Sequence, residues 1–366
     1  MKRIRLAVIG AGHLGRIHAR LAAANPQFDL VAVVDPSPEA RRTVASELEC
    51  TTVTDYRELY GAVDAAIVAT PTRTHYEVTS SLLRAGVHCL VEKPLAHRAD
   101  QAHRLVQIAR NRHRVLQVGH VERFNPMWSA AQGRLEAPQY VEATRCGPFS
   151  GRSTDIGVVF DLMVHDLDLI LSVEQSPIVG ISASGLALLG KHEDLAEARL
   201  EFASGMVAVL RASRVATAAT RRMQWYCHQG FVDIDFSGNT VRVVRPSAAI
   251  CNGELDVDQL PVDQRMQLKS TLFEHYLHRE AIAVERRNAI VDEQHDFAVS
   301  IAAGSQPIVT GDAGARAVEV AEQIVEAIAS RNWQSHWRRQ MAPGSRSATT
   351  KVGPASPTTF PTRRAG

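Results

Sequence analysis

A glycine-rich loop and an acidic residue near the start of the chain have the types and spacing that bind a dinucleotide. Gly10, Gly12 and Gly15 lie in the sequence GAGHLG, after an apolar run and at the opening of a helical pattern. Gly10 permits a tight turn, Gly12 lets the backbone approach a pyrophosphate, and Gly15 allows close helix–strand packing at a helix N-terminus that favours phosphate. Asp35 ends the second apolar run, at the separation from Gly15 where an acidic residue binds the adenosine ribose hydroxyls.

The same region indicates which cofactor this loop binds. The carboxylate of Asp35 would repel a 2′-phosphate, so the sequence favours NAD over NADP. Arg41 and Arg42 lie nearby and could reach a phosphate, which keeps NADP open. Inside the loop, we expect His13 and Leu14 to contribute to the cofactor site, chiefly through their backbone. The alternative is an ordinary glycine turn between a strand and a helix.

Polar residues also follow other apolar runs, at the edge where open α/β sheets bind ligands. The stretches are ATPTRTH (Ala69–His75), VEKPL (Val91–Leu95) and GHVERFNP (Gly119–Pro126). Lys93, fixed before Pro94, is either a solvated strand end or a reagent. Farther along the chain, Asp161 and His165 lie four residues apart in DLMVHDLDLIL, so on a helix they share one face.

The elements that would position these residues alternate over positions 1–120. Apolar runs without polar alternation are typical of parallel strands covered on both faces. These runs are 5–10, 29–35, 64–70, 87–92 and 115–119. Helix-length patterns lie between them, at 18–25, 77–86 and 100–111 among others. The alternation predicts a doubly wound parallel sheet, that is, a Rossmann domain over residues 1–122.

The pattern changes near Phe124. An apolar segment at 157–172 predicts a helix, and alternating runs with glycine-containing turns follow between 180 and 245. Such alternation predicts a large, mostly antiparallel sheet with one face on the core. A helical pattern returns after Leu268, and 315–330 is amphipathic. We therefore expect an α/β chain whose second domain covers residues 123–335. Residues 342–366 are rich in Pro, Ser, Thr and Gly and are predicted to be disordered.

Composition excludes several classes of function. Lys plus Arg is 41 and Asp plus Glu is 39, a balance that gives no reason to expect nucleic acid or an anionic membrane as partner. The five cysteines are odd in number and lack Cys-x-x-Cys spacing, which argues against a disulfide framework and fits a reducing cytoplasm. No stretch reaches the roughly 18 apolar residues of a membrane span. No cluster predicts a metal site.

Taken together, GAGHLG, ATPT with His75, EKP and the Asp161/His165 pair resemble the glucose–fructose oxidoreductase / inositol dehydrogenase family (Gfo/Idh/MocA). The resemblance extends from the N-terminus to about position 330, and its specific part is EKP combined with the aspartate–histidine pair. It implies a Rossmann domain and a C-terminal domain with a large open sheet through which copies form dimers or tetramers. It also implies hydride transfer between a nicotinamide and a carbon bearing a sugar or cyclitol hydroxyl.

The resemblance assigns roles to individual residues. Lys93 is similar to the family lysine that touches the reacting hydroxyl, His165 to the general base, and Asp161 to its acidic neighbour. Such a set fits the chemistry, because the cofactor takes the hydride while a positioned base takes the proton. A solvated lysine, a core histidine and a helix-capping aspartate remain the alternatives. Further matches to the family's cofactor site are Thr70, Pro71, His75 and Glu92.

The stretch GHVERFNP bears on the substrate. It resembles family members that oxidise the 3-hydroxyl of UDP-N-acetylglucosamine to the 3-oxo sugar nucleotide. Arg123 and Asn125 would then contact the sugar or the diphosphate, whereas the alternative for Arg123 is an ion pair at the domain junction. An inositol or free-sugar dehydrogenase of the same family stays open. So does a non-redox protein, such as an NAD-bound sensor or a glycosidase that uses NAD only transiently.

Overall fold

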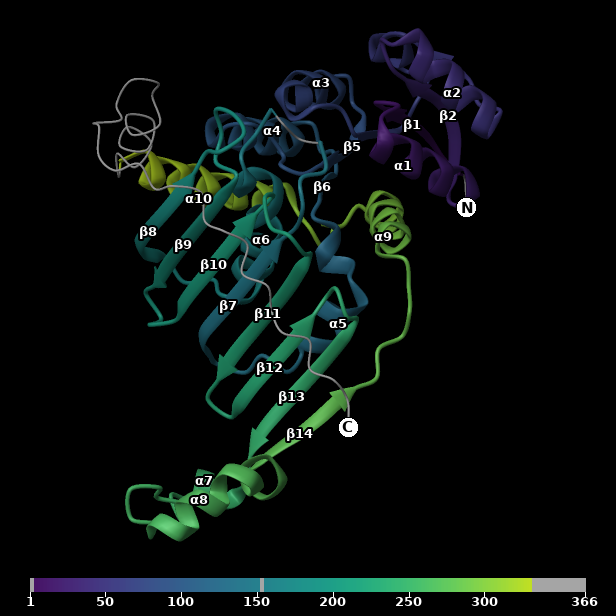
Figure 1. Cartoon of the computed structure of the whole chain (residues 1–366). Helices are drawn as coiled ribbons and strands as arrows, with labels where there is room; N and C mark the ends of the chain where they lie inside the picture. Colours follow the sequence, from purple (N-terminus) through teal and green to yellow (C-terminus); the bar gives the residue numbers. More distant parts are fainter. Residues whose placement is uncertain (1–2, 152–154, 331–366) are drawn as a thin grey trace, which may run out of the picture. The chain divides into compact units, whose positions relative to one another are not determined.

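The computed structural model describes residues 3–151 and 155–330, which form two sheets with their covering helices (Figure 1). The predicted disordered segment 342–366 lies outside the described residues. The predicted domain boundary between residues 122 and 123 stays a prediction. Within the described residues, no helix is long and apolar enough to cross a membrane.

The first sheet has six parallel strands in the order β3-β2-β1-β4-β5-β6. Its strands are β1 (Ile4–Ile9), β2 (Phe28–Val34), β3 (Thr52–Val53), β4 (Ala65–Val68), β5 (His88–Glu92) and β6 (Leu116–Gly119). The strand order reverses between β1 and β4, so their carboxyl ends enclose a crevice in which doubly wound sheets bind ligands. The predicted Rossmann sheet is confirmed. The short strand β3 was not predicted.

Helices cover this sheet as the spacing predicts. They are α1 (His13–Ala24), α2 (Pro38–Leu48), α3 (Thr72–Arg84) and α4 (Ala99–Asn111). The start of α2 shows how the sequence sets a boundary: the Ser37 side chain accepts the Ala40 N–H, and Pro38 occupies the first turn. Central strands are apolar on both faces because helices lie on both; all four residues of β4 are buried.

The second sheet has eight strands in the order β14-β13-β12-β11-β7-β10-β9-β8. They are β7 (Pro138–Cys146), β8 (Ile178–Leu186), β9 (Leu195–Phe202), β10 (Val207–Ser213), β11 (Thr220–Cys227), β12 (Gly230–Asp235), β13 (Thr240–Pro246) and β14 (Leu277–Ile282). Only β7 and β10 pair in parallel among these described strands, so the predicted mostly antiparallel sheet is confirmed. Buried and exposed residues alternate along β9, because one face alone packs on the core.

Three helices join the second sheet to the first. A π-helical turn, η3 (Val159–Met163), runs into α6 (Val164–Val173), and both contact α10 (Gly311–Ser330). Helix α10 also contacts α4 and β8. The short helix α5 (Pro126–Gln132) buries Trp128 against Trp225 of β11, with ring centroids 6.1 Å apart. One contiguous core therefore continues from the parallel sheet to the antiparallel sheet.

Late in the chain, α9 (Ala289–Ala303) returns to the first sheet. Phe297 and Ala298 are buried in a cluster that also contains Leu6 and Phe28. Figure 1 shows α9 beside α1, which it contacts. Helix α9 therefore covers part of the parallel sheet, although its sequence lies far beyond the Rossmann segment.

A protruding segment separates β13 from β14. It contains α7 (Ala248–Cys251), α8 (Val262–Thr271) and the π-helical turn η4 (Leu272–Tyr276), which have no buried residue. Figure 1 places α7 and α8 beyond the end of the sheet. The helical pattern expected after Leu268 is therefore interrupted by a strand.

Candidate active site

The glycine loop has the shape that a bound pyrophosphate requires. Gly10 has φ of 105°, and a Cβ there would lie 2.5 Å from the carbonyl oxygen of Ala69. A Cβ on Gly15 would lie 1.8 Å from the carbonyl oxygen of Gly10, whereas one on Gly12 would meet no atom within 4 Å. Gly10 and Gly15 are thus required by close packing, and Gly12 leaves open space at the N-terminus of α1. The loop fits a dinucleotide on both counts.

Asp35 lies directly after β2 and is held against this loop. Its carboxylate accepts the backbone N–H of Ala11 at 2.8 Å and that of Ser37 at 2.8 Å. Arg41, which the sequence left as a possible phosphate contact, donates to the carbonyl oxygens of Asp35 at 2.6 Å and Pro36 at 3.0 Å. The carboxylate is therefore fixed at the expected ribose position, while Arg41 is engaged by the backbone of the same loop.

A cavity of about 980 Å³ connects this loop with residues of the second sheet. Ten of the residues that the sequence predicted for the site line it: Gly10, Gly12, His13, Leu14, Asp35, Thr70, Pro71, Lys93, Asp161 and His165. Five predicted residues do not: Gly15, His75, Glu92, Arg123 and Asn125. The structure thus brings the candidate catalytic residues together with the candidate cofactor loop, whereas the other five residues do not line the cavity.

Lys93 reaches from the first sheet to the helical segment of the second. It follows β5, and the peptide bond to Pro94 is cis. The ammonium group donates to the backbone carbonyl of Asp161 at 2.6 Å and to its carboxylate at 3.1 Å. The two side chains are only 14% and 18% exposed. Asp161 therefore fixes the orientation of the Lys93 side chain. The alternative interpretation, in which Lys93 is a solvated strand end, does not fit this low exposure.

His165 begins the next helical turn and faces the same cavity. Its Nδ1 is buried and has no hydrogen-bond partner among the described residues. Burial, assisted by the positive charges of Lys93 and Arg145, holds the pKa of His165 well below its usual range. The ring is consequently neutral at pH 7 and can accept a proton.

Glu92, the last residue of β5, contacts the backbone of Lys93. One carboxylate oxygen lies 2.8 Å from Nε2 of His18, and the other accepts the Lys93 N–H at 3.2 Å. Because Gln294 donates to Nδ1 of His18, Nε2 carries the proton and donates to Glu92. Burial is the largest single effect and opposes ionisation, but the hydrogen bond from His18, the neighbouring positive charges and the Lys93 N–H together outweigh it and keep the pKa of Glu92 below its usual value. Glu92 therefore orients the lysine without lining the cavity.

A second buried carboxyl group lies close to Glu92. Both side-chain oxygens of Glu293, on α9, are buried without a hydrogen-bond partner among the described residues. Burial, and then the charge of Glu92, raise the pKa of Glu293 well above its usual value. In the pH range between the two pKa values, Glu293 is therefore protonated while Glu92 is ionised.

His75 fastens two loops that border the cavity. Its Nδ1 lies 2.8 Å from the carbonyl oxygen of Pro94 and its Nε2 lies 2.8 Å from that of Thr70. The residue is 1% exposed, and burial lowers the pKa of its ring. His75 thus ties the loop after Lys93 to the loop after β4, so its contribution to the cofactor site is positional.

The stretch GHVERFNP lies at the junction of the two sheets. Asn125 accepts the Met127 N–H at the start of α5 and donates to Glu122. Arg123 lies 3.8 Å from the carboxylate of Asp168 and donates to the carbonyl oxygen of Ile308 at 3.4 Å. These partners are structural, as in the ion pair that the sequence left as the alternative for Arg123. The predicted substrate contacts of Arg123 and Asn125 remain predictions.

Glu122 belongs to a buried ion-pair network in the same junction. Arg145 of β7 donates to Glu122 at 2.8 Å and to Asp166 at 2.7 Å. All three residues are buried. The network holds β7 and α6, the helix that carries His165, to the stretch that follows β6.

Arg221 was missed by sequence reasoning. It lies on β11, is exposed, and lines the cavity with Lys93 and His165. Its backbone is hydrogen-bonded to Ser237 and Phe236, whereas its guanidinium makes no hydrogen bond within the described residues and is available to an anion. Its neighbour Arg222 instead pairs with Asp233 at 2.6 Å. No sequence signal separates the two arginines, because a single strand residue carries no spacing pattern.

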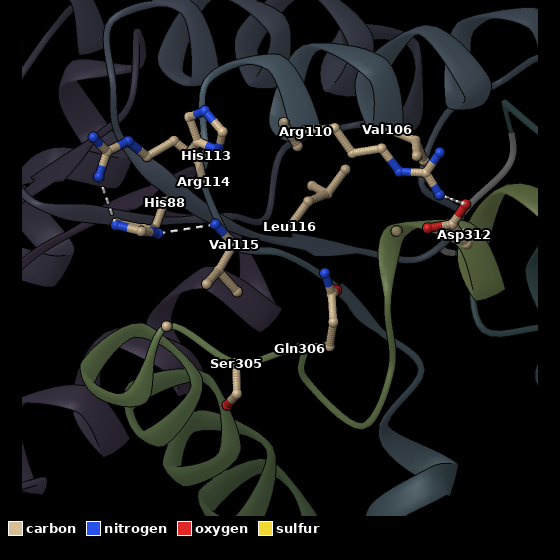
Figure 2. A pocket seen from close by; sticks show the side chains of 13 residues that line it. His88, Val106, Arg110, His113, Arg114, Val115, Leu116, Ser305, Gln306 and Asp312 are labelled. Atoms are coloured by element: carbon tan, nitrogen blue, oxygen red, sulfur yellow. Dashed lines mark hydrogen bonds and ion pairs between the residues drawn. The ribbon is translucent and has the colours of Figure 1, made fainter.

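A smaller cavity, of about 330 Å³, lies at the amino ends of β5 and β6 (Figure 2). Figure 2 shows Arg114 bonded to the ring of His88, and Arg110 paired with Asp312. Burial and then Arg114 lower the pKa of His88 to about 4. None of the predicted site residues lines this cavity. The chemistry is therefore assigned to the larger cavity, at the opposite ends of the strands.

Comparison with known proteins agrees with this geometry. Residues 4–120 match the model of an oxidoreductase family with an NAD-binding Rossmann fold, and residues 130–233 match the GFO/IDH/MocA C-terminal domain. A UDP-N-acetylglucosamine 3-dehydrogenase of Acidithiobacillus ferrooxidans is 36% identical over 329 residues, which cover 90% of this chain and 98% of that protein. An inositol 2-dehydrogenase of Rhizobium meliloti is 25% identical over 344 residues, or 90% and 98% of the two chains.

Solved structures agree as well. The Acidithiobacillus ferrooxidans enzyme superposes with a TM-score of 0.79 over 90% of this chain and 99% of that one. A myo-inositol 2-dehydrogenase of Lactobacillus plantarum superposes with a TM-score of 0.70 over 90% and 98%, and at 22% identity it supports the fold alone. The predicted family, enzyme class and nicotinamide-binding Rossmann domain are thereby confirmed. The chain belongs to the GFO/IDH/MocA family of oxidoreductases.

Proposed function

We propose that this protein oxidises the 3-hydroxyl of UDP-N-acetylglucosamine with NAD, giving the 3-oxo sugar nucleotide. The observation that carries the proposal is the convergence of Lys93, Asp161 and His165 on the cavity that begins at the glycine loop. The substrate choice is supported by the 36% identity to an enzyme named for that reaction.

A nicotinamide dinucleotide held by the glycine loop and Asp35 would supply the hydride acceptor for the carbinol carbon. Neutral His165 takes the hydroxyl proton as general base. Lys93 donates a hydrogen bond to the same oxygen and stabilises the negative charge that develops there. Asp161 holds the ammonium group of Lys93 in position through its carbonyl and carboxylate.

NAD is the proposed cofactor. The carboxylate of Asp35 is fixed by Ala11 and Ser37, so it cannot swing away from an incoming 2′-phosphate without losing two hydrogen bonds. Arg41 donates through Nη1 to the backbone carbonyls of Asp35 and Pro36, which engages that end of its guanidinium within the loop. Both observations favour a cofactor with a free ribose 2′-hydroxyl.

Arg221 is the proposed contact for the substrate diphosphate. A planar guanidinium binds phosphate oxygens in pairs. That of Arg221 makes no hydrogen bond or close ion pair among the described residues, although the charges of Glu122 and Asp166 act on it. Because Arg221 lines the same cavity as Lys93 and His165, a diphosphate bound to Arg221 would bring the attached sugar toward the two catalytic residues. A free sugar or an inositol would leave this arginine unused.

Absorbance at 340 nm tests the proposal. NAD with UDP-N-acetylglucosamine should give NADH, and inositol or free N-acetylglucosamine should give much less. A parallel reaction contains a 2-oxoacid acceptor that would reoxidise NADH that stays bound, and there the 3-oxo sugar nucleotide is measured instead of absorbance. Arg221→Ala should raise KM for the sugar nucleotide, whereas the matched variant Arg222→Ala should not. Preferred turnover of inositol would contradict the substrate, and an equal effect of both variants would contradict the role of Arg221.

Homo-oligomers, dimers or tetramers, are proposed to form through the open face of the second sheet. The face is available because strands such as β9 expose every second residue. Size-exclusion chromatography with light scattering measures the assembly directly.

A cytoplasmic location is proposed together with the reaction, because nicotinamide-linked oxidation of sugar nucleotides draws on a cytoplasmic cofactor pool.

A further inference from the structure

His120 is a buried histidine that the reaction as described does not use. It follows β6, is 0% exposed, and both of its ring nitrogens lack a hydrogen-bond partner among the described residues. An unpaired buried polar atom is costly, so a histidine with two of them requires a reason. Packing alone gives none, because an aromatic ring without nitrogens would fill the same volume.

Two neighbouring side chains also contain a buried polar atom without a hydrogen-bond partner among the described residues. Nδ1 of His165 is buried without a hydrogen-bond partner among the described residues. One carboxylate oxygen of Asp168, Oδ2, also accepts no hydrogen bond there, although Arg123 lies 3.8 Å from it as an ion pair. His165 and Asp168 are three residues apart on α6 and therefore share a face. The rings of His120 and His165 stand nearly perpendicular, at 85°, with centroids 6.4 Å apart. Four buried atoms without a hydrogen-bond partner among the described residues thus belong to three neighbouring side chains.

We propose that His120 links Asp168 to His165 in a hydrogen-bonded chain that positions His165 as the base. The proposal rests on the proposed function, since it concerns the base of that reaction. At 6.4 Å between ring centroids, the two rings are joined through one water or after a small closing movement of the sheets.

The direction of each hydrogen bond follows from the ends of the chain. Asp168 accepts only, so the nearer nitrogen of His120 carries the proton and donates to it. The other nitrogen of His120 then accepts, and Nδ1 of His165 donates. This places the lone pair of His165 on Nε2, the nitrogen left for the hydroxyl proton. The chain therefore selects the tautomer in which His165 is a base toward the cavity.

No proton passes beyond His165 in this arrangement. The hydroxyl proton bonds to Nε2, and the resulting imidazolium is stabilised through His120 by the carboxylate of Asp168. His120 and Asp168 are accordingly positioning residues. Arg123, 3.8 Å from that carboxylate, holds it in place, which gives a structural reason for the arginine in GHVERF.

Other charges act on the two rings and must be kept constant in a test. The charged and titratable groups that face them are Lys93, Glu92, Arg123, Arg145, Asp168 and Arg221. Variants at position 120 change none of these groups. A pH profile that differs between such variants and the wild type therefore reports on the chain itself.

Two substitutions of His120 separate hydrogen bonding from packing. Gln can accept from His165 through its carbonyl and donate to Asp168 through its amide, whereas Phe keeps the ring volume and removes both bonds. We expect His120→Phe to lower kcat by about 100-fold with KM for NAD unchanged, and His120→Gln to keep most of the rate. Asp168→Asn should shift the acid limb of the kcat profile to lower pH. A packing role predicts the reverse order, with Phe active and Gln impaired, and would overturn the proposal.

The tautomer of His165 is measured independently of any substrate. In protein labelled with ¹⁵N-histidine, the resonances of His165 are identified by their loss in His165→Gln. We expect the Nδ1-protonated neutral form at pH 7 in the wild type and a shift toward the Nε2-protonated form in His120→Phe. The same tautomer in both would overturn the chain, whereas inactivity of the wild type toward UDP-N-acetylglucosamine would overturn only the proposed function.

Discussion

Gly15→Ala and Gly12→Ala, two substitutions in one loop, should fail in different ways. A Cβ on Gly15 would lie 1.8 Å from the carbonyl oxygen of Gly10, whereas real Cβ contacts essentially never fall below 3.0 Å. Helix α1 or the loop must therefore shift by roughly 1 Å to relieve the overlap. Both neighbours are backbone, so the strain cannot be relieved by a side-chain rotation. We expect Gly15→Ala to lower the free energy of unfolding by about 3 kcal/mol, the upper range for overpacking.

Gly12→Ala is the matched control, because its Cβ would enter open space and its φ of −68° suits any residue. The free energy of unfolding should change by less than about 1 kcal/mol. The new methyl group would instead occupy the space expected for the pyrophosphate, so NAD should no longer raise the melting temperature. Urea unfolding with and without NAD measures both effects. Wild-type stability in Gly15→Ala, or wild-type NAD stabilisation in Gly12→Ala, would refute the account of the loop.

Three further perturbations test the surroundings of the site. Glu293→Gln should stabilise the protein relative to the wild type, and increasingly so as pH rises above 4.5, by up to about 1.4 kcal/mol per pH unit. The reason is that wild-type Glu293 releases its proton in the unfolded chain and retains it in the folded state. Equal stability of both proteins at pH 5 and 8 would contradict a protonated Glu293. Arg145→Met should cost about 3–5 kcal/mol in urea unfolding, since it leaves two carboxylates buried without their partner, and adding Glu122→Gln and Asp166→Asn should restore most of the loss. Asp35→Asn keeps an acceptor for the Ala11 N–H but removes the negative charge. The ratio of kcat/KM with NAD to kcat/KM with NADP should therefore fall by about tenfold or more. An unchanged ratio would show that Asp35 does not select the cofactor.

The parallel sheet could be predicted because its signals are local. Each central strand is apolar on both faces and ends in a turn, so five of six strands were found, and β3 escaped because two residues carry no pattern. The hairpins of the second sheet were predicted by alternation for the same reason. Strand β14 was not predicted, and neither was the packing of α9 on the first sheet, although a helical pattern was expected after Leu268. The contacts that hold these elements join residues distant in sequence, as when Phe297 packs with Leu6.

The candidate site divides along the same line. The glycine loop and Asp35 were predicted from spacing, and Lys93, Asp161 and His165 from a family resemblance, because these residues belong to short contiguous motifs. Arg221 was missed because it faces the cavity through its register in β11, which the sequence does not mark. His120 lies within GHVERFNP, a motif that the sequence singled out, but its proposed role depends on Asp168 and His165. Those two residues come close to it only when α6 packs against the end of β6.

The most direct test of the central claim follows the hydride itself. UDP-N-acetylglucosamine carrying deuterium at C3 is incubated with the enzyme and NAD, and the reduced cofactor is analysed by mass spectrometry. The account predicts that the cofactor gains the label from C3, and that Lys93→Met and His165→Gln bind NAD but transfer almost none. Label that stays on the sugar, or that reaches the cofactor only from another carbon, would contradict it.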